Sequence, residues 1–61
     1  MSKFYYWALS LTHGVLTTDP VEASRWVTKL QLAGEPMTSG IADSWLERQA
    51  AIDAFYLKEG V

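Results

Sequence analysis

The absence of cysteine constrains this chain of 61 residues more than any other feature of its sequence. A domain of this size buries only about 60% of the surface of its unfolded chain, so small domains are commonly stabilised by disulfides, metals or association with another chain. Disulfides and thiolate metal sites are excluded, and a single histidine, His13, does not suffice for a structural zinc site. We therefore expect neither a metal nor a cofactor, and association with a second chain is the remaining source of stability.

The composition is that of a folded domain. Hydrophobic residues make up 49% of the chain, which excludes a disordered segment, and the length accommodates one domain over residues 1–61. Polar residues interrupt the apolar run of residues 9–16, so the sequence predicts no signal peptide and no membrane span. Together with the lack of cysteine, this favours a cytoplasmic protein.

A β-hairpin is predicted at the N-terminus. Residues 3–11 are rich in aromatic and β-favouring side chains and predict a strand, and residues 15–18 predict a second, shorter strand. Gly14 is expected to supply the positive φ angle of a two-residue turn between them. In this register Leu11 faces Leu16, so that the apolar faces of both strands agree.

A helix is predicted over residues 20–33. Asp19 is the expected N-cap, Pro20 occupies the first helical position, and Glu22 completes a capping box. Gly34 is the expected C-cap. The helix has a single apolar stripe, formed by Ala23, Trp26, Val27, Leu30 and Ala33.

A second helix is predicted over residues 40–58, following a connector at residues 34–40, with Thr38 or Ser39 as its N-cap and Gly60 at its end. This segment carries apolar residues on two nearly opposite sides of the helix. One side consists of Ile41, Trp45, Ile52, Phe55 and Tyr56, and the other of Leu46, Ala50, Ala54 and Leu57. A small domain can readily bury only one of these sides, which predicts that a partner covers the other.

These elements predict an α+β fold in which an N-terminal β-hairpin is followed by two α-helices packed on one face of the sheet, in the order ββαα. The core is expected to contain Trp7, Trp26, Trp45 and Phe55. The first strand is longer than the second, so its N-terminal half has no expected partner within the chain. Such an edge invites pairing, and dimerisation is one way to extend the sheet.

The distribution of charge argues against nucleic acid as a partner. The net charge is −2, and the basic residues are scattered, at Lys3, Arg25, Lys29, Arg48 and Lys58. Duplex DNA is bound mainly through clustered lysine and arginine side chains on its phosphates. A small dimeric nucleic-acid-binding or regulatory protein is the alternative reading, because two copies could join their Arg25 and Lys29 pairs.

No pattern of residues predicts catalysis. The serines lack an accompanying histidine and carboxylate, and His13 lies on the predicted turn. Asp43 and Glu47 are one helical turn apart, a spacing typical of solvated surface. The glycines lack the spacing of a phosphate-binding loop. We expect a protein that is not an enzyme and has no small-molecule substrate.

The apolar and tyrosine-rich segments are the candidate interface. Tyrosine is enriched at protein interfaces because its ring is apolar and its hydroxyl polar. The candidate interface residues are Phe4, Tyr5, Tyr6, Leu46, Ala50, Tyr56 and Leu57.

The sequence thus predicts a non-enzymatic protein–protein interaction module, acting as a homo-oligomer or on a larger protein partner. Small proteins without a catalytic set are frequent among phage and mobile-element accessory proteins, which inhibit a host enzyme or defence complex. That expectation concerns the class, and no single residue carries it.

Overall fold

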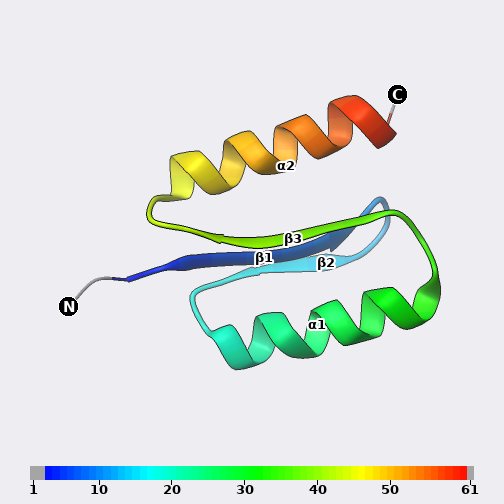
Figure 1. The fold of residues 1–61 in the computed structure, drawn as a ribbon, viewed down its shortest axis with the longest axis horizontal. Coiled ribbons are helices and arrows are strands. Elements are labelled where there is room, and N and C mark those ends of the chain that lie inside the picture. The colour runs from blue at the N-terminus through cyan, green and yellow to red at the C-terminus, as the bar shows by residue number, and fades with distance from the viewer. Residues whose placement is uncertain (1–2, 61) are drawn as a thin grey trace.

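The computed structural model describes residues 3–60, which form a three-stranded sheet and two helices (Figure 1). The elements are β1 (Tyr5–Ser10), β2 (Gly14–Thr17), α1 (Pro20–Ala33), β3 (Met37–Ala42) and α2 (Trp45–Glu59). The predicted α+β class and the N-terminal hairpin are confirmed. The order differs from the expected ββαα, because a third strand lies between the helices.

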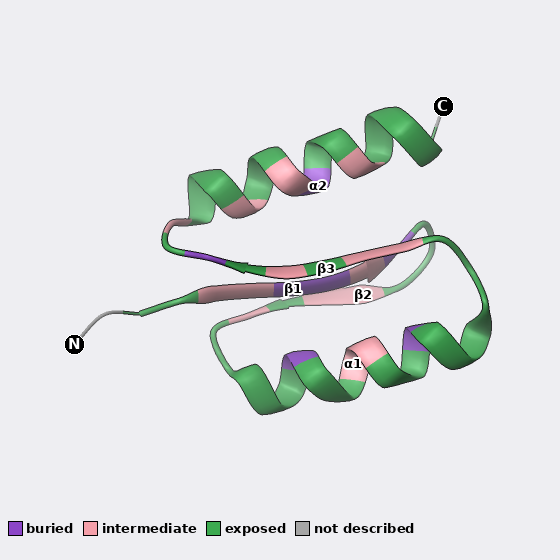
Figure 2. Cartoon of the chain, in the orientation of Figure 1, coloured by how far each residue is buried: buried purple, intermediate pink, exposed green. Residues whose placement is uncertain are grey.

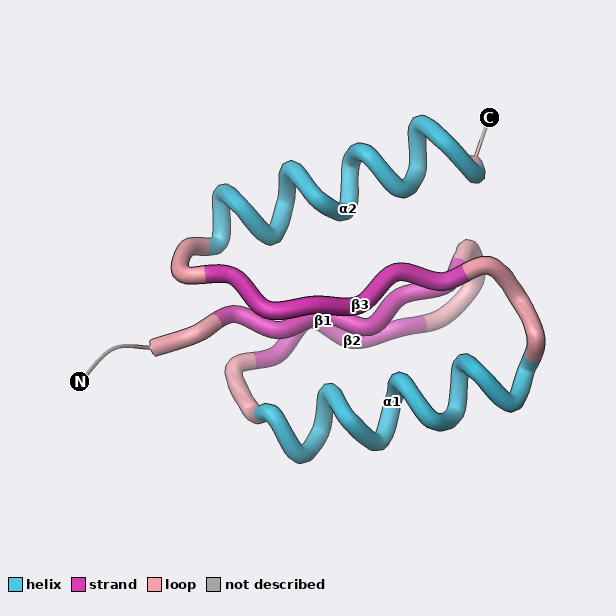
Figure 3. The backbone as a smooth tube through the Cα atoms, in the orientation of Figure 1, coloured by secondary structure: helices cyan, strands magenta, loops and turns pink. Residues whose placement is uncertain are grey.

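The sheet is antiparallel, with strand order β2-β1-β3. The long first strand is therefore central, and every residue from Tyr5 to Ser10 pairs with a residue of β3. The prediction that the N-terminal half of this strand lacks a partner is wrong. Its partner is the strand of residues 37–42, whereas the sequence predicts a connector over residues 34–40 (Figure 3).

The two helices cover opposite faces of the sheet, and not one face as predicted (Figure 1). α1 lies against β1 and β2, α2 lies against β3 and β1, and the two helices do not contact each other. Successive side chains of a strand point to opposite faces. Trp7 belongs to the core under α2, and the next residue, Ala8, is completely buried on the α1 side.

Three residues, 11–13, connect the strands of the hairpin, instead of the predicted two-residue turn. Leu9 pairs with Gly14, and Trp7, not Leu11, pairs with Leu16. Gly14 has no positive φ angle and lies in β2, where a Cβ atom would come within 2.6 Å of the Ala8 carbonyl oxygen. Glycine is required at this position for close approach to β1.

The hydroxyl group of Ser10 holds the hairpin loop together. Ser10 is 2% exposed, and its Oγ accepts hydrogen bonds from the backbone N–H groups of Thr12 (3.3 Å) and His13 (3.1 Å). It donates to the His13 carbonyl oxygen (3.2 Å). These bonds satisfy a buried polar side chain and two backbone donors.

The boundaries and caps of α1 agree with the prediction, except for one hydrogen bond. The Asp19 carboxylate accepts from the N–H of Val21 (2.9 Å), and Gly34 ends the helix in the left-handed region with φ 75°. The Asp19 N–H donates to Thr17 Oγ1 (3.0 Å), which takes the place expected for Glu22 in a capping box.

The second helix begins later than predicted. Ser44 is its N-cap, with Oγ accepting from the N–H of Glu47 (3.3 Å), so Thr38 and Ser39 do not have that role. Ile41 lies in β3, outside the helix. Among residues 3–60, no helix combines the length and apolar character needed to cross a membrane.

The core is divided between the two faces of the sheet (Figure 2). Under α2, Trp7, Ala42 and Ile52 form a buried cluster. On the other face, α1 contributes the buried residues Ala23 and Leu30. Two further aromatic residues predicted for the core, Trp26 and Phe55, are half-buried. Trp45 is 56% exposed, so its assignment to the core is wrong.

Candidate interaction surfaces

The outer side of α2 exposes apolar side chains to solvent. Leu46 is 64% exposed and Leu57 is 75% exposed, and Ala50 is exposed between them. At 100° per residue, these three side chains lie within about 40° of one another on the helix. We name Leu46, Ala50 and Leu57 the α2 outer face.

The opposite side of the same helix is already occupied by the sheet. Ile52 is buried in the cluster with Trp7, and Ala51 packs against that cluster. Arg48 Nη1 donates to the Tyr6 carbonyl oxygen (3.4 Å). The α2 outer face therefore points away from the sheet.

The predicted interface residue Tyr56 lies on a different side of α2. Its ring packs against that of Phe55, with centroids 5.5 Å apart and an angle of 57° between the planes. Tyr56 is 41% exposed. It borders the sheet-facing side and is not part of the α2 outer face.

The predicted interface residues near the N-terminus do not form one surface. Tyr5 and Tyr6 are half-buried neighbours in the central strand, so their side chains point to opposite faces. The Tyr5 ring lies 5.2 Å from the guanidinium carbon of Arg48, a cation–π contact on the α2 side. Phe4 precedes the strand and is 39% exposed.

Each helix leaves one edge strand uncovered on its face of the sheet. α2 does not contact β2, and Leu16, which shares the face of its cross-strand partner Trp7, is 49% exposed. On the other face α1 makes little contact with β3, and Ile41, paired with Tyr6, is 53% exposed. The sequence did not predict these two exposed sites, because it predicted neither the strand β3 nor the placement of the two helices on opposite faces of the sheet.

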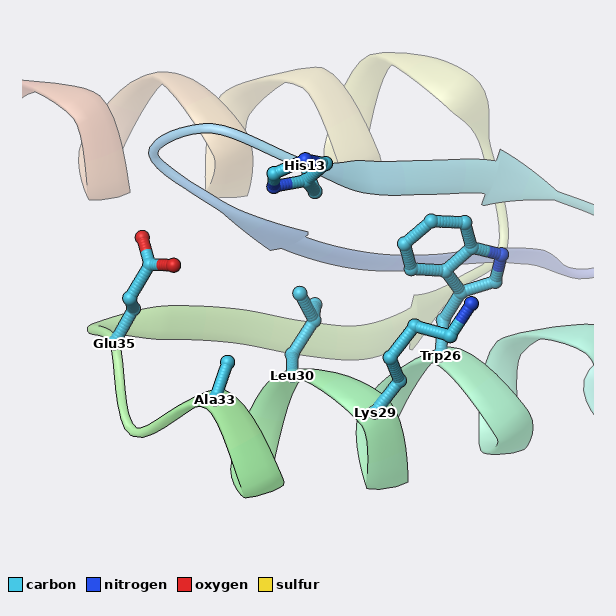
Figure 4. Close-up of a pocket in the computed structure, with 6 residues that line it drawn as sticks. All are labelled: His13, Trp26, Lys29, Leu30, Ala33 and Glu35. Carbon is cyan, nitrogen blue, oxygen red and sulfur yellow. The ribbon is translucent and has the colours of Figure 1, made fainter.

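A pocket of about 380 Å³ lies between the hairpin loop and the C-terminal half of α1 (Figure 4). Lys29 Nζ lies 4.7 Å from the Trp26 ring centroid, another cation–π contact. The lining residues are His13, Trp26, Lys29, Leu30, Ala33 and Glu35. The sequence did not predict this pocket, because its lining comes from three separate segments.

A short chain of hydrogen bonds joins two residues at the rim of this pocket. Thr12 Oγ1 donates to Glu35 Oε1 (3.2 Å) and lies 2.8 Å from His13 Nδ1. A hydroxyl group has one proton, so once it donates to the Glu35 carboxylate it must accept from His13 Nδ1–H. In neutral His13 this leaves Nε2 as the unprotonated ring nitrogen.

Comparisons with protein-family models, with curated proteins and with solved structures find no match to this chain.

Proposed function

We propose that this protein is a non-enzymatic protein–protein interaction module that binds a larger protein through the α2 outer face. The observation that carries the proposal is the exposure of Leu46 and Leu57 on a helix whose other side is already packed against the sheet. Exposed leucines on one helix face are the usual anchors of helix-mediated recognition. Ala50 between them lets a partner approach the helix backbone closely.

The partner surface that fits the α2 outer face is an apolar groove with a polar rim. Gln49 and Asp53 flank the leucines on the side of the helix that lies away from Glu47 and Lys58. Gln49 Nε2 donates to Asp53 Oδ1 (3.0 Å), which holds that rim in place. We propose further that the protein is a phage or mobile-element accessory protein, which inhibits a host enzyme or defence complex by binding to it.

The nucleic-acid alternative has less support from the geometry. Arg48 is engaged with the Tyr5 ring and the Tyr6 carbonyl oxygen, and Lys29 lies over Trp26. The two cations belong to helices on opposite faces of the sheet. A nucleic-acid site usually gathers its cations on one face.

Site-specific photo-crosslinking tests the proposed function. A photoreactive residue in place of Ala50 should crosslink one protein in an extract of the cells that carry the gene, and the same residue in place of Ser24 on α1 should not. Leu57→Glu in the Ala50-labelled protein should remove the crosslink while leaving the circular dichroism spectrum unchanged. Equal crosslinking with and without Leu57→Glu would exclude the α2 outer face as the binding surface.

A further inference from the structure

We propose that β3 pairs with β3 of a second copy of this chain, so that two sheets join into one of six strands. This self-association uses the outer edge of β3 and one flank of α2, and it goes beyond the proposed function because the α2 outer face stays free for a different partner. Four features of the structure support it: the direction of the backbone groups of β3, the residues at that edge, the residues on the adjoining flank of α2, and the distances between them.

The outer edge of β3 presents free backbone groups. Within residues 3–60, β3 has a strand neighbour on one side only. The Ser10 N–H donates to the His13 carbonyl oxygen (2.7 Å), on the β2 side of the hairpin, so the even-numbered residues of β1 direct their backbone groups toward β2. The odd-numbered residues of β1 then face β3, where they meet Thr38, Gly40 and Ala42. The alternate residues of β3, namely Met37, Ser39 and Ile41, direct their N–H and C=O groups outward.

The side chains along this edge are suited to pairing with themselves. An antiparallel pairing centred on Ser39 places Ile41 opposite Met37 of the second copy, and Met37 opposite Ile41 of the second copy. Ile41 is 53% exposed and Met37 is half-buried, and both lie on the face that α1 leaves largely uncovered at β3. Pairing would therefore cover the exposed Ile41 side chain of each copy. β3 carries no charged side chain, which would otherwise disfavour pairing at this edge.

Chirality determines which flank of α2 adjoins this edge. β1 and α2 run in the same direction (Figure 1). Consider the sheet viewed from α2, with β1 pointing upward. The odd-numbered residues of β1, such as Trp7, then have their side chains toward the viewer, and L-chirality directs their N–H and C=O groups to the right. Because these groups pair with β3, β3 lies to the right of β1. In a right-handed helix pointing upward above the sheet, each residue that precedes a sheet-facing residue also lies on the right. The sheet-facing residues include Arg48, Ile52 and Phe55, so the flank beside the β3 edge includes Glu47, Ala51 and Ala54, and Lys58 lies one turn after Ala54.

This flank is complementary to itself. A two-fold axis perpendicular to the sheet makes the two α2 helices antiparallel, with Ala51 beside Ala54 of the second copy. The same rotation brings Glu47, in the first turn of one helix, beside Lys58, in the last turn of the other, and repeats that pair on the opposite side of the axis. Small residues at the centre and opposite charges at both ends favour a second copy over an unrelated partner.

The distances allow both contacts to share one axis. Strands pair about 4.8 Å apart, and α2 lies over β3 and β1, so joining two β3 strands places the α2 axes roughly 8 to 10 Å apart. That is the usual separation of packed helices. α2 starts two residues after the end of β3 and runs back antiparallel to it. The distance along the helix axis from its start to its middle is about 11 Å, which is the length of three or four residues of a strand. The middle of α2 therefore lies near Ser39, the centre of the proposed strand pairing.

Analytical ultracentrifugation tests the strand pairing. The unmodified protein should sediment with twice the chain mass of 6.9 kDa. Ser39→Pro should give a folded monomer, because proline removes an outward N–H group and is tolerated at a free strand edge. Leu57→Glu is the matched control and should dimerise like the unmodified protein, which separates this proposal from the α2 outer face. A folded Ser39→Pro dimer, or an unmodified protein that stays monomeric at hundreds of micromolar, would overturn the proposal.

A charge exchange tests the helix contact without altering the strand. Glu47→Lys and Lys58→Glu should each weaken the dimer about tenfold, because each places like charges together at both ends of the interface. The double variant should recover the affinity of the unmodified protein, since it restores both pairs with their signs reversed. If the double variant dimerises no better than either single variant, the two helices do not meet in this way. This test also decides the proposal if Ser39→Pro does not fold.

Discussion

Gly40 lies directly opposite Trp7 in the pairing of β3 with β1. A Cβ atom at Gly40 would come within 2.5 Å of the Trp7 indole carbon Cζ2. The Trp7 indole therefore lies over the backbone of β3, where Nε1 donates a hydrogen bond to Thr38 Oγ1 (3.2 Å). A buried indole, a hydrogen bond to a neighbouring side chain and a glycine form one unit of the core beneath α2.

Gly40→Ala should lower the free energy of unfolding by about 1 to 3 kcal/mol, because the added methyl group overlaps a buried ring that has little room to move. Urea denaturation measures this change. Ser24→Ala, at an exposed position of α1, is the control and should change stability by less than about 0.5 kcal/mol. A Gly40→Ala variant as stable as this control would contradict the close packing of Trp7 on β3.

Gly40 also explains why the sequence does not predict β3 as a strand. Residues 37–42 read MTSGIA, and a glycine between two hydrophilic residues and two apolar ones is typical of a loop followed by the start of a helix. The segment is a strand because β1 offers a complementary edge and Trp7 fills the space above Gly40. Such a long-range contact cannot be predicted from local propensity.

Local chemistry, by contrast, was sufficient for α1. Asp19, Pro20 and Gly34 each act on backbone groups one to three residues away, so their spacing in the sequence determines both ends of the helix. For the candidate interface, helical periodicity correctly grouped Leu46, Ala50 and Leu57, whereas Tyr5 and Tyr6 could not be placed without knowing that their strand is central.

The hydrogen bonds at the start of α1 predict different effects for its two acidic residues. Asp19→Ala should destabilise the protein by about 1 kcal/mol, because the Val21 N–H loses its acceptor. Glu22→Ala should have a smaller effect, because Thr17 Oγ1 already accepts from the Asp19 N–H. Chemical denaturation of both variants distinguishes this N-terminus from a reciprocal capping box, in which both changes would be costly.

Substitutions on the two sides of α2 should differ in their effect on the free energy of unfolding. Ile52→Ala removes a side chain that is 4% exposed from the cluster with Trp7 and should cost about 2 to 4 kcal/mol. Leu57→Ala, at 75% exposure, should change the free energy of unfolding by less than about 0.5 kcal/mol. Denaturation at a protein concentration low enough to keep the chain monomeric makes the comparison. A large loss for Leu57→Ala would mean that this leucine is part of the fold and not of an interface.

Ser10→Ala should be more destabilising than its small change in volume suggests. The Ser10 hydroxyl accepts from two loop N–H groups and donates to the His13 carbonyl oxygen, so its removal leaves polar groups of the hairpin loop without their partner. We expect a loss of about 1 to 3 kcal/mol, with faster amide hydrogen exchange at Thr12 and His13. Thr12→Val is the comparison variant in the same loop. It removes a solvent-exposed hydroxyl group that contacts Glu35, His13 and Ser10 but leaves the Ser10 hydroxyl and its backbone partners in place, and it should cost less than about 1 kcal/mol. If Ser10→Ala left both the stability and the exchange of these two amides unchanged, the loop would be held by its flanking strands alone.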